Sequence, residues 1–289
     1  MFRDFERFLG KEYRDCEEKL SQKNKEVFDF YEELDYFMNT IKKHIQLKED
    51  DFQGGTILGL FAKSLTTYKS IYLLYRHCFC NNSDELCRIL FEELVNIAFC
   101  SLGKDETRRY LSLQYINQYK INNIINEKSN EKYLPKGFKE QAFKEQSYED
   151  RKKDLFEKLN KLCGEEILDD KGKPIAIDLM NRIRKTKNKQ LMHLYLTFYR
   201  IVSTAIHSSP EILRKSIDTY EDGLMKSFSW GILTEDCKIA PIFTSMYFMI
   251  MNMEKISQYF GYPNKKIIVK YWERLQVLGK KNDYFFEKL

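Results

Sequence analysis

The stretch ELCRILFEELVNIAFCSLG, residues 85–103, has the pattern of one α-helix that is apolar over most of its surface. Its apolar residues recur at spacings of three and four, which is the helical period, and Gly103 is a residue type that often ends helices. The whole chain of 289 residues contains only five prolines and twelve glycines, so few residues interrupt helices elsewhere. We therefore predict an all-α fold.

A strip of polar residues runs along this apolar helix. Arg88, Glu92 and Asn96 are spaced by four residues and therefore lie on one face. Charged side chains among apolar neighbours are costly unless they are paired. In one interpretation Arg88 and Glu92 form an exposed ion pair worth only about 0.3–0.5 kcal/mol. In the other, the strip faces a second helix and orients polar residues there.

Helical periodicity extends to both sides of this stretch. The further helices are expected at 12–46, 56–79, 105–127, 150–163, 176–185, 188–207, 238–260 and 265–278. The one over 56–79 is nearly apolar and should lie at the centre of a bundle. Since no segment shows the alternation of a strand, we expect an antiparallel helical bundle with additional N- and C-terminal helices.

The connections between these helices carry turn signals. The segment EDDFQGG, residues 49–55, interrupts the periodicity. In CNNSDEL, residues 80–86, Asn82 or Ser83 is expected to cap the following helix. The polar segment 127–150 predicts a long loop or a small insertion.

The length of the chain is large for a single hydrophobic core. We expect an N-terminal helical extension over 1–50 and a core bundle over 51–215. Residues 216–289 would form C-terminal helices packed on that core.

Composition limits the classes of function. The net charge is +5, from 48 basic and 43 acidic residues that are interspersed, which permits an anionic partner without requiring one. The most apolar run, residues 239–253, is shorter than the roughly 20 residues of a membrane-spanning helix. The N-terminus lacks an apolar signal core, so we expect a cytoplasmic protein with no membrane partner.

Seven cysteines without a CxxC pair favour a reducing compartment over a disulfide framework. The cluster RHCFC, residues 76–80, lacks the second ligand pair that zinc sites usually have. No Walker loop, GxSxG, HExxH or GxGxxG motif occurs. We therefore predict no metal and no other cofactor.

A second stretch, LTFYRIVSTAIHSSPEIL at residues 196–213, contains the candidate catalytic residues. Arg200, Ser203, Thr204 and His207 fall on one helical face. These groups suit metal-free RNA cleavage, because an imidazole can move a proton and a guanidinium can hold the phosphate. Alternatively, His207 ends the helix and interacts with its negative end. Pro210 would then lie in the first turn of the next helix.

Together the two stretches resemble an uncharacterised family of bacterial helical proteins over residues 55–210. Its recurring marks are an Arg-x3-Glu helix and a Tyr…Ser-x3-His-Ser-x-Pro helix end. The matching residues here are Arg88, Glu92, Tyr199, Ser203, His207, Ser208 and Pro210.

More distantly, Arg200-x6-His207 resembles the Arg-x4–6-His motif of the HEPN superfamily (higher eukaryotes and prokaryotes nucleotide-binding domain). Members are helical bundles and often homodimeric, metal-independent ribonucleases in toxin–antitoxin, abortive-infection and CRISPR systems. The resemblance implies an RNA substrate, a homodimer, a role as toxin or antiviral effector and a regulatory protein partner. Active members often carry a polar residue after the arginine, where this chain has Ile201.

Two functions are thus expected from the sequence. The first is a HEPN-like endoribonuclease, with a catalytic set and a supporting polar network. The catalytic set is Arg200, His207, Ser203 and Thr204, and the supporting network is Arg88, Glu92, Asn96 and Tyr199. The alternative is a non-catalytic helical binding or scaffold protein, in which the Arg–Glu–His network only fixes the bundle.

Overall fold

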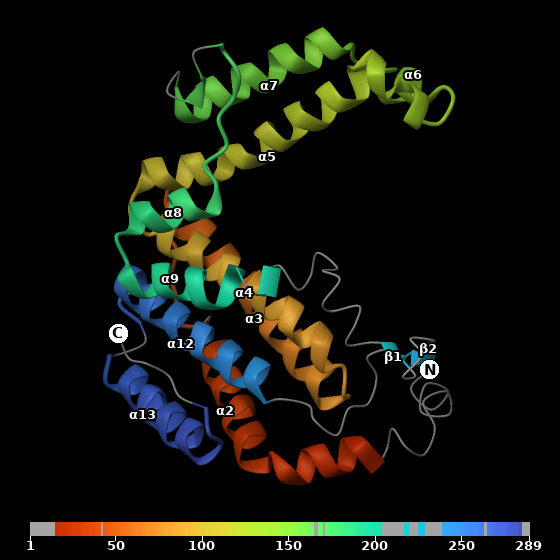
Figure 1. Cartoon of the computed structure of the whole chain (residues 1–289). Coiled ribbons are helices and arrows are strands. Elements are labelled where there is room, and N and C mark those ends of the chain that lie inside the picture. Colours follow the sequence, from red (N-terminus) through yellow and green to blue (C-terminus); the bar gives the residue numbers. More distant parts are fainter. Residues whose placement is uncertain are drawn as a thin grey trace. The chain divides into compact units, whose positions relative to one another are not determined.

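Helices dominate the computed structural model, which describes residues 15–41, 43–164, 167–169, 171–200, 202–203, 217–219, 225–228, 239–262 and 265–284 (Figure 1). The all-α class is confirmed. The α-helices are α2 (Lys25–Ile41), α3 (Phe52–Arg76), α4 (Cys80–Cys100), α5 (Lys104–Asn126), α6 (Phe138–Ala142), α7 (Tyr148–Cys163), α8 (Leu179–Thr186), α9 (Lys189–Leu194), α12 (Ala240–Phe260) and α13 (Lys265–Lys281). A 3-10 helix, η1 (Lys128–Tyr133), and a π-helix, η3 (Tyr195–Tyr199), complete the set.

The chain divides into two compact units. Unit 1 combines Met1–Ala98 with Thr186–Leu289, and unit 2 is the intervening segment Phe99–Lys185. Within unit 1, α12 from the C-terminal part of the chain packs against both α3 and α2.

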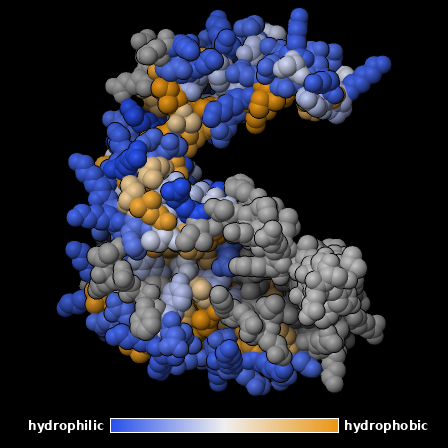
Figure 2. All heavy atoms as spheres, viewed as in Figure 1, coloured by the Kyte–Doolittle hydropathy of each residue, from blue (hydrophilic) through white to orange (hydrophobic). Residues whose placement is uncertain are grey.

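The core of unit 1 is built around α12. Every residue of this helix from Pro241 to Met253 is buried, and the helix packs against α3, α13 and α2. A helix that is apolar on all sides must be covered on all sides, so the apolar run 239–253 occupies the centre of the unit. Among the described residues, no helix combines the length and apolarity that crossing a membrane requires. Hydrophilic residues predominate on the visible face of the molecule, with hydrophobic ones between them (Figure 2).

Two tyrosines join α2 to α3 within this core. The rings of Tyr31 and Tyr68 stack with centroids 3.9 Å apart, and both side chains are fully buried. Each hydroxyl donates to the other residue's backbone carbonyl, at 2.5 Å from Tyr31 and 3.3 Å from Tyr68. The pair therefore satisfies its own buried polar atoms while supplying aromatic surface to the core.

Unit 2 is organised by a hairpin of two long helices, α5 and α7, which lie side by side and antiparallel (Figure 1). The segment 127–150 between them contains η1 and α6, so the expected long connection carries short helices of its own. Ile116, Leu159 and Ile167 form the buried cluster of this unit.

The starts of α3 and α4 differ from the sequence expectation for reasons that the structure shows. Helix α3 begins at Phe52, inside the segment expected to interrupt it, because the Asp51 carboxylate accepts a hydrogen bond from the Gly54 N–H at 2.8 Å. A Cβ on Gly54 would lie 2.3 Å from that carboxylate, so any other residue there would displace the capping side chain. Helix α4 begins at Cys80, which places Asn82 and Ser83 inside the helix. Ser83 is buried and donates to the backbone carbonyls of Ile71 and Phe79 instead of capping.

One antiparallel strand pair, β1 (Ile217–Thr219) and β2 (Met225–Phe228), was not expected. Strands of three and four residues are too short to show an alternating pattern. The expected turn and helix start around Pro210 lie outside the described residues.

Candidate functional site

The polar strip of α4 meets the helical segment that follows α9, and Tyr199 makes the connection. Arg88 Nη2 lies 3.1 Å from Glu92 Oε1, which is the i,i+4 ion pair expected from the spacing. The same Nη2 donates to the Tyr199 hydroxyl at 3.2 Å, and that hydroxyl donates to Glu92 Oε1 at 2.8 Å. The Arg88 guanidinium also lies over the Tyr199 ring, 5.2 Å from its centroid. The three side chains form one closed network, here called the Arg–Glu–Tyr network.

This network is half-buried. The side chains of Arg88 and Glu92 are 24% and 36% exposed, so the pair is neither a fully solvated surface pair nor a desolvated one. Burial raises the pKa of Tyr199, and Glu92 raises it further, while Arg88 acts against them. Burial alone would lower the pKa of Arg88, but Tyr199 and Glu92 raise it overall. The phenol therefore stays protonated and continues to donate to Glu92.

Tyr199 ends a π-helical turn. Its ring stacks on Tyr195 with centroids 5.3 Å apart and contacts Phe91 of α4 at 5.5 Å. Phe198, from the same turn, contacts Phe91 and also Phe248 of α12. A π-turn inserts one residue into the helical ladder and often occurs at functional sites. Neither this turn nor its aromatic contacts were evident from the sequence, because they depend on partners in other helices.

The candidate catalytic residues lie directly after this turn. Arg200 follows Tyr199 and is exposed, and Ser203 is helical and half-buried. Asn96, the last member of the polar strip, is half-buried on α4. His207 and Thr204 lie outside the described residues.

A buried carboxylate next to the network was missed by the sequence analysis. The side chain of Glu93 is 2% exposed, accepts a hydrogen bond from Thr67 at 3.1 Å and lies 3.6 Å from Lys63 Nζ. Its other oxygen has no hydrogen-bond partner among the described residues. Burial raises the pKa of this carboxyl. One feature of the sequence could have indicated this burial. Glu93 follows the buried Leu90 by three residues, and that helical spacing places both side chains on the same buried face.

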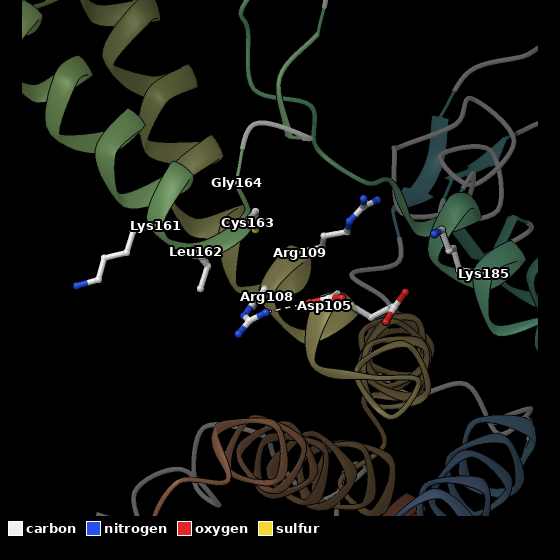
Figure 3. Close-up of a pocket in the computed structure, with 9 residues that line it drawn as sticks. Asp105, Arg108, Arg109, Lys161, Leu162, Cys163, Gly164 and Lys185 are labelled. Atoms are coloured by element: carbon white, nitrogen blue, oxygen red, sulfur yellow. Dashed lines mark hydrogen bonds and ion pairs between the residues drawn. The ribbon is translucent and has the colours of Figure 1, made fainter.

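Unit 2 contains a polar cavity of about 510 Å³ (Figure 3). Arg108 and Arg109 of α5, Lys161 of α7 and Lys185 of α8 line it. In Figure 3 the side chains of Arg109 and Lys185 extend toward one another from different helices. These basic residues come from three segments of the sequence, so no local motif could have predicted that they line one cavity.

Carboxylates and a thiol complete the wall of this cavity. Asp105 pairs with Arg108 at 2.9 Å, and Glu106 lies beside it in the first turn of α5. Burial raises the pKa of the Cys163 thiol, while Ser112 and Arg109 work against that shift.

A second cavity of about 200 Å³ shares Arg109 and Cys163 with the first. Its wall combines the apolar side chains of Ile167, Ile175 and Ile177 with the polar ones of Ser112 and Asn181.

The cysteine cluster near residue 78 contains a thiol contact. Cys78 Sγ lies 3.2 Å from Cys16 Sγ, and both thiols are free. Within the described part of the chain, no three or more His, Cys, Asp or Glu side chains are placed to hold a metal ion.

Comparison with known proteins gives one match. The model of a family of unknown function, DUF5677, matches residues 55–224, which is more than half of the chain. The matched region contains both Arg88 and Glu92 on α4 and the segment with Tyr199 and Arg200. No curated protein and no solved structure matches the chain. On the extent of this match, the chain belongs to DUF5677, a family of unknown function.

Proposed function

We propose that this protein is a metal-independent endoribonuclease of the HEPN type, in which Arg200 and His207 act on RNA. The observation that carries the proposal is the bonding of Tyr199, the residue before Arg200, to both Arg88 and Glu92 at 3.2 and 2.8 Å. An arginine that stabilises a transition state must be held in position before the reaction. The Arg–Glu–Tyr network anchors the turn from which Arg200 extends.

The proposed reaction uses the RNA's own 2′-hydroxyl. His207 accepts the proton of that hydroxyl as its oxygen attacks phosphorus, the bond from phosphorus to the 5′ oxygen breaks, and a proton is returned to the leaving oxygen. The exposed guanidinium of Arg200 binds the phosphate as its charge develops. Ser203 and Thr204 would supply hydroxyl contacts. The product end is a 2′,3′-cyclic phosphate.

The proposal includes assembly. Two copies would pair about a two-fold axis so that their Arg200 and His207 faces meet in one cleft. A role as toxin or antiviral effector, restrained by a partner protein, is part of the same proposal.

A second candidate is a non-catalytic helical scaffold, and one observation favours it. Arg88 Nη2, Glu92 Oε1 and the Tyr199 hydroxyl bond one another in a closed set that forms without a substrate, although the buried Nε of Arg88 has no hydrogen-bond partner among the described residues. A closed network of this kind fixes the packing of helices without chemistry. Ile201, where active relatives often carry a polar residue, points the same way.

Cleavage of single-stranded RNA in EDTA separates the two candidates. Wild type should release 2′,3′-cyclic phosphate ends and leave DNA intact. Arg200→Ala and His207→Ala should each lower the rate about 10²–10⁴-fold. Matched controls are Arg184→Ala and His193→Ala, because both residues are exposed and lie outside the polar strip. All variants must unfold at the wild-type temperature. If wild type and His207→Ala show equal, negligible cleavage, the ribonuclease proposal is wrong and the scaffold candidate is favoured.

A further inference from the structure

Cation–aromatic pairs among the described residues fall into two groups. In the first group a glutamate oxygen lies 3.4 Å or less from the cation; its pairs are Arg76–Tyr72, Arg88–Tyr199 and Arg274–Phe30. In the second group Lys132 lies over the ring of Tyr133, 4.8 Å from its centroid, and Arg151 lies over Phe143 at 5.3 Å. Neither of these two cations forms an ion pair with a described residue. A ligand that carries negative charge would supply the missing partner.

Both pairs of the second group lie at one end of the helical hairpin of unit 2. Lys132 and Tyr133 end η1, which follows α5, while Phe143 follows α6 and Arg151 lies in the first turns of α7. Figure 1 shows α6 at this end, where α5 ends and α7 begins. The whole end belongs to the continuous described range 43–164.

The ring of Tyr133 is open to solvent and surrounded by lysines. Its side chain is 75% exposed, so Lys132 covers one face of the ring and leaves the other open. Lys128, Lys132 and Lys136 follow one another at steps of four residues, and all three are exposed. Tyr36 of α2 is also 75% exposed, but it lies in a different setting. The charged residues just before it are all acidic: Glu32, Glu33 and Asp35.

The turn that carries this ring is held in place by hydrogen bonds. Asn130 donates to the Ile124 carbonyl at 3.0 Å, which ties η1 to α5. Lys139 donates to the Asn126 carbonyl at 3.1 Å and pairs with the Glu131 carboxylate at 3.0 Å, which ties α6 to both α5 and η1. A surface that is ordered before binding loses less entropy when a ligand arrives.

We propose that this end of unit 2 binds single-stranded RNA, with one base stacked on the open face of Tyr133 and an adjacent phosphate bound by Lys132. Proteins that bind single strands combine cations along the backbone with aromatic rings on which bases stack, and this pair supplies both. The pair of Arg151 with Phe143 offers a second cation at the same end. A single strand is favoured over a duplex, because paired and stacked bases cannot reach the ring.

The choice of RNA as the strand rests on the proposed function, which this contact deepens by holding the substrate at a second place. Binding here requires no cleavage, so it can be measured separately.

Fluorescence anisotropy with a labelled, uncleavable 2′-O-methyl RNA 12-mer measures binding by the full chain. Tyr133→Ala should weaken binding about tenfold, because it removes one base-stacking contact. Tyr133→Phe keeps the ring and should bind like wild type. Tyr36→Ala is the matched control, because it removes an equally exposed tyrosine from unit 1, and it should leave the affinity unchanged.

The salt dependence of binding tests the phosphate contact. Lys132→Gln should lower the slope of log K against log salt concentration by about 0.7, the value for one phosphate contact on a single strand. Tyr133→Ala should leave this slope unchanged, because stacking releases no counterions. Lys104→Gln removes an exposed lysine at the opposite end of α5 and should keep the wild-type slope.

Repeating Tyr133→Ala in an Arg200→Ala background separates this contact from the proposed active site, and the same fold-change is expected in both backgrounds. If wild type cleaves no RNA but Tyr133→Ala still weakens binding of the 12-mer, the ribonuclease proposal fails and this contact stands.

Equal affinities of wild type, Tyr133→Ala and Lys132→Gln for the 12-mer would overturn the inference. Tighter binding of a duplex 12-mer than of the single strand would overturn it too. So would binding to phosphatidylserine vesicles that Tyr133→Ala abolishes, without any binding of RNA, because this end would then be a membrane contact. Thermal unfolding of each variant must match wild type, as the exposure of both side chains leads us to expect.

Discussion

The Tyr199 hydroxyl donates to Glu92 at 2.8 Å and accepts from Arg88 at 3.2 Å, so one phenol holds together two segments more than a hundred residues apart. Tyr199→Phe removes both bonds and leaves the half-buried ion pair with one partner fewer. We expect a loss of about 1–3 kcal/mol in the free energy of unfolding, measured by urea denaturation. Tyr195→Phe is the matched control, because Tyr195 stacks on the same ring and its hydroxyl makes no hydrogen bond among the described residues. Equal losses in both variants would contradict a stabilising network.

The buried carboxyl of Glu93 should make stability depend on pH. Burial raises its pKa above the usual value of 4.5, so the folded state holds this proton to higher pH than the unfolded state does. The contribution of Glu93 to the free energy of unfolding therefore falls as pH rises from about 4.5 through the raised pKa. The cost of burying the ionised carboxylate persists at neutral pH. Glu93→Gln should raise the melting temperature at pH 7 and leave it nearly unchanged at pH 4.

Glu85→Gln is the control for this experiment, because Glu85 is exposed on the same helix. A lower melting temperature of Glu93→Gln at pH 7 would show that the contact with Lys63 outweighs the cost of burial.

The tyrosine pair between α2 and α3 gives a stability prediction for the core. Tyr31→Phe keeps the stacked ring but removes the hydroxyl that donates to the Tyr68 carbonyl at 2.5 Å. That carbonyl is buried, so we expect a loss of about 1–3 kcal/mol in the free energy of unfolding. Tyr36→Phe, on the same helix with a side chain that is 75% exposed, should be neutral within about 0.5 kcal/mol. Thermal unfolding of the three proteins compares them directly.

Oxidation should join Cys16 to Cys78, whose sulfur atoms lie 3.2 Å apart. With oxidised glutathione as the oxidant, the two thiols form one disulfide and the glutathione disulfide is reduced to two glutathione thiols. Burial, together with the neighbouring Cys16, raises the pKa of Cys78 to about 12, so little thiolate exists at neutral pH and the reaction should accelerate as pH rises. The bond closes a loop of about 60 residues and should add about 4 kcal/mol of stability.

Peptide mapping by mass spectrometry identifies this bond, and a higher melting temperature reports its effect. Cys16→Ser should abolish both changes. A disulfide between other cysteines under the same conditions would contradict the prediction.

Several of the long helices could be predicted from the sequence by itself. Helix α5, expected at 105–127, spans Lys104–Asn126, and α12, expected at 238–260, spans Ala240–Phe260. The i,i+4 ion pair of Arg88 with Glu92 also follows from spacing alone. All of these depend on residues a few positions apart, and the helical period relates such residues whatever the rest of the chain does.

Only the tertiary structure decided which of these helices meet and what their side chains contact. The spacing on α4 could not show that Glu92 bonds Tyr199 while Glu93 turns toward Thr67 of α3. The convergence of Arg109 and Lys185 on one cavity was equally hidden. Each of these contacts joins residues that are distant in the sequence, so the packing of several helices at once sets them, and no local pattern records that packing.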